Sequence, residues 1–251
     1  MDKNSMLYWF PKIKDIEGIQ YPKTEFVKVS WGYDYYKYIS EEPIPQDVIE
    51  RLKITARRIG YPLFMRTDHL SGKHSLAGFI SYIENEDMLV KNLYRLLEES
   101  ACAGLMGLPV EAIVLREYVE LDACFKAFGG IPIAKERRYF IKDGKVLCHH
   151  PYWEEAAIRF WKSCGIKEPD NWRKKLAKIN KESKKEVKLL TKKAQLVANV
   201  MEGFWSIDFA HTKDGRWILI DMAVGEDSWH PPECEYCPEE IRVVMSRVRR
   251  G

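Results

Sequence analysis

The segment GFWSIDFAHTKDGRWILIDMA, residues 203–223, constrains the fold of this chain more than any other. Two largely apolar runs, 204–211 and 216–222, flank the dipeptide Asp214-Gly215. Asp-Gly between such runs favours a two-residue type I′ turn, in which both central residues take positive φ. We therefore predict a tight, mostly buried β-hairpin.

A two-residue turn would place Lys213 opposite Arg216 and, counting outward, Asp208 directly opposite Asp221. Opposed residues of an antiparallel pair point to the same face about 5 Å apart, so the two carboxylates repel unless something neutralises them. A divalent cation would do so, because hard cations take oxygen ligands. The alternative is a nearby arginine or solvent at the strand end, and a three-residue loop would shift the pairing by one.

Basic residues occur upstream, in a small polar loop at 67–75. The loop is not a Walker A motif, because Thr67 stands where the first glycine belongs and His74 follows Lys73 in place of Ser or Thr. Its backbone N–H groups and Lys73 could still surround phosphates, and Arg66 before it could bind a phosphate with two nitrogens. A solvated turn with a surface lysine is the other interpretation.

A second predicted hairpin pairs 137–141 with 146–148 about another Asp-Gly turn. Residues two apart on a strand share a face, so Glu136 and Arg138 should point together. They form either a surface ion pair of little worth or a phosphate-binding arginine oriented by an acid.

The remaining segments alternate between strand-like and helix-like patterns, which indicates a layered α/β or α+β fold. We predict strands over 24–29, 61–66, 76–83 and 111–119, and helices over 45–60, 86–101, 153–164 and 171–201.

Composition is that of an ordinary globular chain, with 46% apolar and 31% charged residues. No run approaches the roughly 20 apolar residues that span a bilayer, and the N-terminus lacks a secretory signal, so we expect a cytoplasmic protein. The stretch 171–195 is rich in lysine. It is either the solvated face of an amphipathic helix or a site for a polyanion such as nucleic acid. Salt-dependent binding lost on neutralising Lys184, Lys185 and Lys188 would identify the latter.

The six cysteines do not suggest a disulfide scaffold. Cys234 and Cys237 form a CxxC pair preceded by His230, but a zinc site needs four ligands and no second close pair exists. Folding could bring His149 and His150 near. We expect a plain or redox-sensitive loop in preference to a zinc site.

In their order, the segments from about residue 21 to 229 resemble the ATP-grasp superfamily. YPLFMR resembles the strand that carries the first basic phosphate ligand, here Arg66 where most members have lysine. SGKHS, with Lys73, resembles the loop that closes over the phosphates. ERRYFIKDGKV resembles the strand whose arginine, here Arg138, contacts the γ-phosphate or the acyl intermediate.

LREYVELD resembles the strand and hinge that hold adenine. The resemblance implies backbone bonds to the base from Glu117 and Val119, on either side of Tyr118. It also implies that Asp122 or Glu120 reaches the ribose.

SIDFAHTKDGRWILIDMAVGEDS resembles the metal-binding end, with Asp208 and Asp221 as the two acids. The family usually shows Glu-x-Asn where this chain has Asp221-Met222-Ala223, and alanine cannot ligate a metal. Glu226 or Asp227 could take that place.

The resemblance implies an α+β ATP-grasp fold, a single domain over 1–251 with lobes at 1–110 and 111–251. It implies ATP and Mg²⁺ as ligands and an ATP-dependent carboxylate–amine ligase acting through an acylphosphate on an unidentified carboxylate. The alternatives are a phosphoryl or nucleotidyl transferase acting on nucleic acid, and a non-catalytic nucleotide-binding module.

Overall fold

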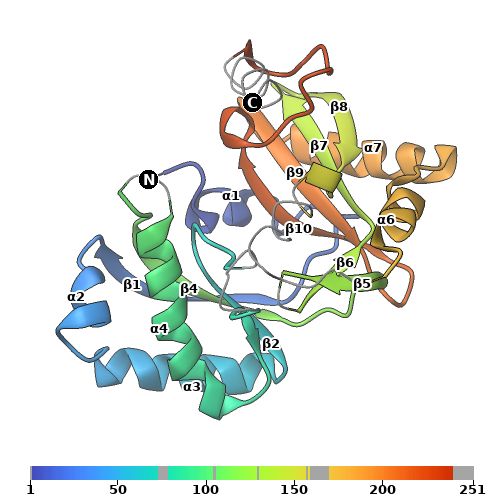
Figure 1. Cartoon of the computed structure of the whole chain (residues 1–251). Coiled ribbons are helices and arrows are strands. Elements are labelled where there is room, and N and C mark those ends of the chain that lie inside the picture. The colour runs from blue at the N-terminus through green and yellow to red at the C-terminus, as the bar shows by residue number, and fades with distance from the viewer. Residues whose placement is uncertain are drawn as a thin grey trace.

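A computed structural model describes residues 2–72, 79–103, 106–128, 130–156, 158 and 170–239. Its strands form two four-stranded antiparallel sheets and a smaller two-stranded one (Figure 1). The first sheet has the order β1-β4-β2-β3, and its strands are β1 (Thr24–Gly32), β4 (Val110–Glu117), β2 (Leu63–Thr67) and β3 (Tyr82–Ile83). The second has the order β10-β9-β7-β8, and its strands are β10 (Trp217–Val224), β9 (Phe204–His211), β7 (Glu136–Lys142) and β8 (Lys145–Pro151). Strands β5 (Ala123–Ala127) and β6 (Ile131–Ala134) form the small sheet.

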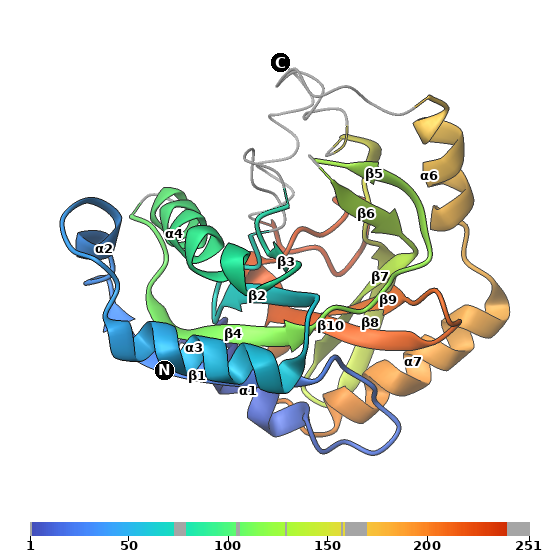
Figure 2. The ribbon, with the colours of Figure 1, turned by 90° about the horizontal axis from the view of Figure 1, so that it is seen from below.

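Each large sheet carries its own helices, as the two views show (Figures 1 and 2). Those in the first half of the chain are α1 (Met6–Ile13), α2 (Tyr36–Ser40), α3 (Gln46–Ile59) and α4 (Glu86–Cys102). Those in the second half are α6 (Trp172–Asn180), α7 (Lys184–Ala198) and the short 3₁₀ turn η1 (Gly225–Asp227). None of the helices in the described ranges combines the length and the apolar character needed to cross a bilayer.

The first sheet packs one face against α3 and α4. Leu63, Met65 and Leu115 point to that side and are fully buried there with leucines of α4. Because side chains alternate along a strand, Arg66 and Arg116 point to the other side, toward the second sheet. The alternation thus separates a core face from a face that carries charge.

The second sheet is covered by α7 and by α1 from the other end of the chain. Tyr139, Ile207 and Phe209 are fully buried in a core shared with Trp9 of α1 and Leu190 of α7. The opposite face of this sheet is left for the polar side chains described below.

Several predicted elements differ from the structure. The single helix expected over 171–201 is two helices, because the Ser183 side chain accepts a bond from the backbone N–H of Glu186 and begins α7 anew. The strand expected over 76–83 is described only as Tyr82–Ile83, and the helix expected over 153–164 lies mostly outside the described residues.

The strand expected over 111–119 is present as β4, and it pairs with β1 and β2. The first sheet therefore includes a strand from beyond residue 110, and α1 from before that point packs in the core of the second. The division into lobes at 1–110 and 111–251 remains a prediction.

The C-terminal hairpin reaches the expected pairing by a different route. Its loop holds three residues, closed by a 2.8 Å bond from the backbone N–H of Thr212 to the carbonyl of Arg216, so the two-residue turn was wrong. The next pairs are shifted by one, but a bulge between Leu219 and Asp221 removes the shift. Asp208 therefore lies opposite Asp221, as predicted.

Candidate functional site

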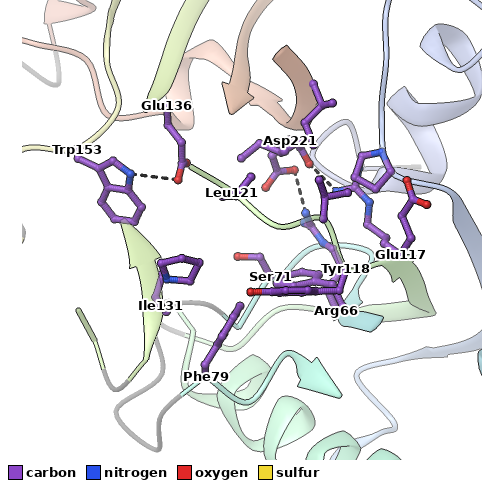
Figure 3. A pocket seen from close by; sticks show the side chains of 17 residues that line it. Arg66, Ser71, Phe79, Glu117, Tyr118, Leu121, Ile131, Glu136, Trp153 and Asp221 are labelled. Atoms are coloured by element: carbon purple, nitrogen blue, oxygen red, sulfur yellow. Dashed lines mark hydrogen bonds and ion pairs between the residues drawn. The ribbon is translucent and has the colours of Figure 1, made fainter. Parts of the chain in front are cut away.

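A cleft of about 740 Å³, including its open mouth, lies between the two large sheets (Figure 3). One part of its wall is apolar and aromatic, and another carries buried arginines and carboxylates. The lining side chains are Pro22, Phe64, Arg66, Ser71, Phe79, Arg116, Glu117, Tyr118, Val119, Leu121, Ile131, Pro132, Glu136, Trp153, Ile218, Ile220 and Asp221. Volume and lining suit a small ligand with an apolar end and an anionic end.

The segment that leaves β4 forms one wall of this cleft. Glu117, Tyr118 and Val119, which the sequence placed at the adenine hinge, all line it. Asp122 does not: it is exposed, and its Oδ2 lies 3.3 Å from Nδ1 of His211. The structure therefore brings the hinge residues into the cleft and leaves the predicted ribose ligand outside.

Arg66 connects the two sheets across the cleft. It is 3% exposed, and its Nη1 donates to Oδ1 of Asp221 at 2.9 Å. Its Nε and Nη2 donate to the backbone carbonyls of Thr67 and His69 at 3.1 and 3.4 Å. These carbonyls hold the guanidinium in the direction of the second sheet. Lys73, predicted to follow it, lies outside the described residues.

Arg138 and the two aspartates form a row across the second sheet. In register, Arg138 lies opposite Asp208 on β9, and Asp208 lies opposite Asp221 on β10. Arg138 donates from Nε and Nη2 to the two oxygens of Asp208, both at 2.8 Å. Burial disfavours the charged guanidinium, but Asp208, with Tyr152 and Asp221, outweighs this and raises the pKa of Arg138. Arg138 is therefore a permanent cation.

Both aspartates are thus neutralised by arginine, Asp208 by Arg138 and Asp221 by Arg66. This is one of the alternatives that the sequence left open. The two carboxylates still offer oxygen ligands on one face of the sheet, which fits a hard divalent cation. Of the possible substitutes for the missing asparagine, Asp227 accepts a 2.7 Å bond from Asn4, and Glu226 is exposed.

Arg116, a buried cation of the cleft, was not singled out from the sequence. Its Nη1 donates to the carbonyl of Ile220 at 2.6 Å, and its buried Nη2 has no partner in the described part of the chain. Burial and the nearby charge of Arg66 lower the pKa of Arg116 to about 10. The signal was a charged residue inside an otherwise apolar strand, AIVLRE.

Glu136 and Trp153 also line the cleft and were not predicted as site residues. The indole Nε1 of Trp153 donates to Oε1 of Glu136 at 3.1 Å (Figure 3). The register confirms that Glu136 and Arg138 point to the same face, as their spacing predicted. The acid that binds Arg138 is nevertheless Asp208, from the neighbouring strand.

Two antiparallel sheets facing each other across a cleft, with buried arginines and a hinge in its wall, define the ATP-grasp fold. A family described as an ATP-grasp domain, the third family of its clade, matches residues 59–245, so the chain belongs to this family. No curated protein sequence matches the chain.

Solved structures agree with this fold at low sequence identity. C-terminally truncated Cdc123 from Schizosaccharomyces pombe is similar with a TM-score of 0.55 and 13% identity, over 89% of this chain and 86% of that one. D-alanyl-alanine synthetase A from Vibrio cholerae aligns with a TM-score of 0.49 and 10% identity, over 89% of this chain and 56% of that one.

Proposed function

We propose that this protein is an ATP-dependent ligase of the carboxylate–amine type, with ATP in the cleft between the sheets. The observation that carries the proposal is the meeting of Arg66, from the first sheet, with the row of Arg138, Asp208 and Asp221 on the second. Such a meeting places cations and metal-type ligands from both sheets at one point, where the triphosphate would lie.

The wall of the cleft suggests how ATP would be oriented. The adenine would lie against the hinge, Glu117–Val119, among apolar side chains that include Phe79 and Ile131. The phosphates would extend toward Arg66 and Arg116. The structure gives no support to the ribose contact implied for Asp122.

Asp208 and Asp221 would hold the Mg²⁺ that accompanies ATP. Bound there, the ion would neutralise phosphate oxygens. Arg66 and Arg138 could then pair with phosphate oxygens instead of with these carboxylates. The arginine–aspartate pairs would thus keep the charges of the free site balanced, and with nucleotide their members would serve separately.

The chemistry requires positioning and charge, with no covalent help from the protein. An oxygen of the substrate carboxylate attacks the γ-phosphorus and ADP leaves, which gives an acylphosphate. An amine then attacks the acyl carbon and inorganic phosphate leaves. Arg138, on the cleft face of β7, would stabilise the charge that develops in both steps. Such a ligase would work in the cytoplasm, where ATP is supplied.

Replacement of Asp208 tests this assignment. Asp208→Asn should weaken Mg²⁺-dependent ATP binding, measured by calorimetry. It should also lower ATP consumption with a panel of carboxylates and amines by about 10²–10³-fold, since it removes charge at the reacting phosphates. Asp214→Asn, in the exposed turn of the same hairpin, is the matched control and should leave both unchanged. Undiminished Mg²⁺-dependent binding and turnover in Asp208→Asn would contradict the metal role.

The products distinguish the two remaining functions. Lys184, Lys185 and Lys188 are exposed on α7, where nucleic acid could reach them. ADP and phosphate support a ligase, AMP and pyrophosphate support a nucleotidyl transferase, and tight ATP binding without turnover supports a non-catalytic module.

A further inference from the structure

The chain beyond η1 returns across the polar face of the second sheet. The hydroxyls of Ser228 and Ser206 lie 2.7 Å apart, and Nη1 of Arg138 donates to the carbonyl of Trp229 at 3.3 Å. The imidazole of His230 stacks on the ring of Phe140, with centroids 3.9 Å apart and planes at 11°. His230 is therefore fully buried, against a strand that is distant in sequence.

Four side chains of ligand type meet where this segment reaches the edge strand β8. They are Cys148 and His150 of β8, and His230 and Cys234 of the returning segment. One nitrogen or sulfur from each lies within 4.8 Å of all the others, and Sγ of Cys148 is 3.3 Å from Nε2 of His230. Cys148 and His150 are two apart on a strand and so share a face.

The spacing is close to that of a tetrahedral metal site. With Zn–S near 2.3 Å and Zn–N near 2.05 Å, the ligand atoms of a tetrahedral zinc site are about 3.3–3.8 Å apart. The observed group needs to contract by only about 1 Å to reach that spacing. Two thiols and two imidazoles are also a common ligand set of structural zinc.

The protonation states of the cluster suit a metal. Burial, and then the neighbouring His149, lower the pKa of His150 to about 4, which leaves the neutral imidazole that can ligate. Nε2 of His150 is buried without a hydrogen-bond partner among the described residues. Burial also raises the pKa of the Cys148 thiol, and a bound cation would reverse this by stabilising the thiolate.

We propose that Cys148, His150, His230 and Cys234 bind a structural zinc ion. The CxxC pair seen in the sequence supplies only its first cysteine, because Sγ of Cys237 lies 3.7 Å from the carbonyl oxygen of His230 and 3.6 Å from that of Pro238. The other ligands come from a strand more than eighty residues earlier. Four protein ligands leave no open position, so the ion has a structural role.

The zinc ion would fasten the returning segment to the free edge of the second sheet. His150 lies opposite Arg138 in the β-ladder, and His230 follows the residue whose carbonyl Arg138 contacts. The ion would therefore hold fixed the surroundings of Arg138 without touching the nucleotide. This inference does not depend on the proposed ligase activity.

Metal analysis of the full-length protein tests the proposal. Protein purified with zinc present should contain one zinc per chain by mass spectrometry, and X-ray absorption at the zinc edge should show two sulfur and two nitrogen ligands. Cobalt(II) exchanged into the stripped protein should give thiolate charge-transfer absorption and the intense visible bands of tetrahedral coordination.

Serine variants locate the ligands. Cys148→Ser and Cys234→Ser should each weaken zinc binding by on the order of a hundredfold, in competition with a chromophoric chelator, because each removes one of four ligands. Cys237→Ser, and Cys102→Ser at an exposed position of α4, should bind as the unaltered protein does.

Three results would overturn the proposal. One is purified protein without zinc that also fails to give the tetrahedral cobalt spectrum. Another is binding that Cys237→Ser abolishes and Cys234→Ser does not. The third is an absorption spectrum with mainly oxygen ligands, which decides the matter on unaltered protein even if a variant does not fold.

Discussion

The two faces of β7 place adjacent arginines in opposite settings. Arg137 and Arg138 are both largely or fully buried, and each donates to a carboxylate from another element. Arg137 points to the helix side of the sheet, and Arg138 points to the cleft. Because side chains alternate along a strand, neighbouring residues of one type can do unrelated work.

Arg137 is enclosed by the protein. Its Nε donates to Glu186 of α7 at 2.6 Å, its Nη1 to the carbonyl of Glu136 at 2.9 Å, and its Nη2 to the carbonyl of Ile179 at 2.8 Å. Its side chain is fully buried. These bonds tie α7 and the end of α6 to the sheet, which is a structural role.

Arg138 keeps 14% of its side chain exposed and lies with its guanidinium 4.8 Å from the ring of Tyr152. Its main partner, Asp208, is also a potential metal ligand. Burial and ion pairing are therefore similar for the two arginines, and the face of the sheet distinguishes a structural guanidinium from one available to a ligand.

The largest effect should follow from removing the guanidinium on the cleft face. Arg138→Met should lower ATP turnover by about 10²–10³-fold, because a cation near the reacting phosphate is lost. Arg138→Lys should recover part of this, since it keeps the charge without the two-nitrogen contact. Turnover is measured with Mg²⁺ in excess, beside circular dichroism as a control for folding. Full turnover in Arg138→Met would place the phosphates elsewhere.

The helix face should respond in stability. Arg137→Met should lower the free energy of unfolding by about 3–5 kcal/mol, because it leaves Glu186 without its buried partner. The measurement is urea unfolding followed by fluorescence, and ATP affinity of the folded protein should stay within about twofold. If this variant lost ATP binding while keeping its stability, the contrast between the faces would be wrong.

A smaller effect concerns pH on the same helix face. Burial alone would raise the pKa of Glu182, but the hydrogen bond from His149, at 3.0 Å, and the charge of Arg137 outweigh it and hold the pKa below 4.5. The folded chain therefore binds fewer protons than the unfolded chain near pH 4. Its free energy of unfolding then falls as pH falls through this range.

We expect Glu182 to contribute less than about 1 kcal/mol of that fall, the usual size for a partly exposed pair. Glu182→Gln should lose less stability than the unaltered protein between pH 6 and roughly pH 3.5, in urea unfolding at each pH. Glu120→Gln, in the exposed pair with Lys213, is the matched control. Parallel curves for Glu182→Gln and the unaltered protein would exclude this contribution.

Local patterns in the sequence were sufficient for much of the fold. The hairpins about Asp143-Gly144 and Asp214-Gly215, and the helices α3 and α4, lie where periodicity and turn residues placed them. The opposition of Asp208 and Asp221 was also correct, although the turn was one residue longer than predicted. A bulge compensated for it, and bulges depend on how a strand must bend to pack, which no local pattern encodes.

The sequence by itself determined the order of the elements, the family that this order resembles, and the acids and bases available to a site. Only the tertiary structure decided which of them meet. It paired Asp221 with Arg66 across 155 positions, brought Arg116 into the cleft, and gathered Cys148 and His150 with His230 and Cys234. The physical reason is that periodicity fixes which face of an element a side chain occupies, whereas contacts between faces depend on how whole sheets pack.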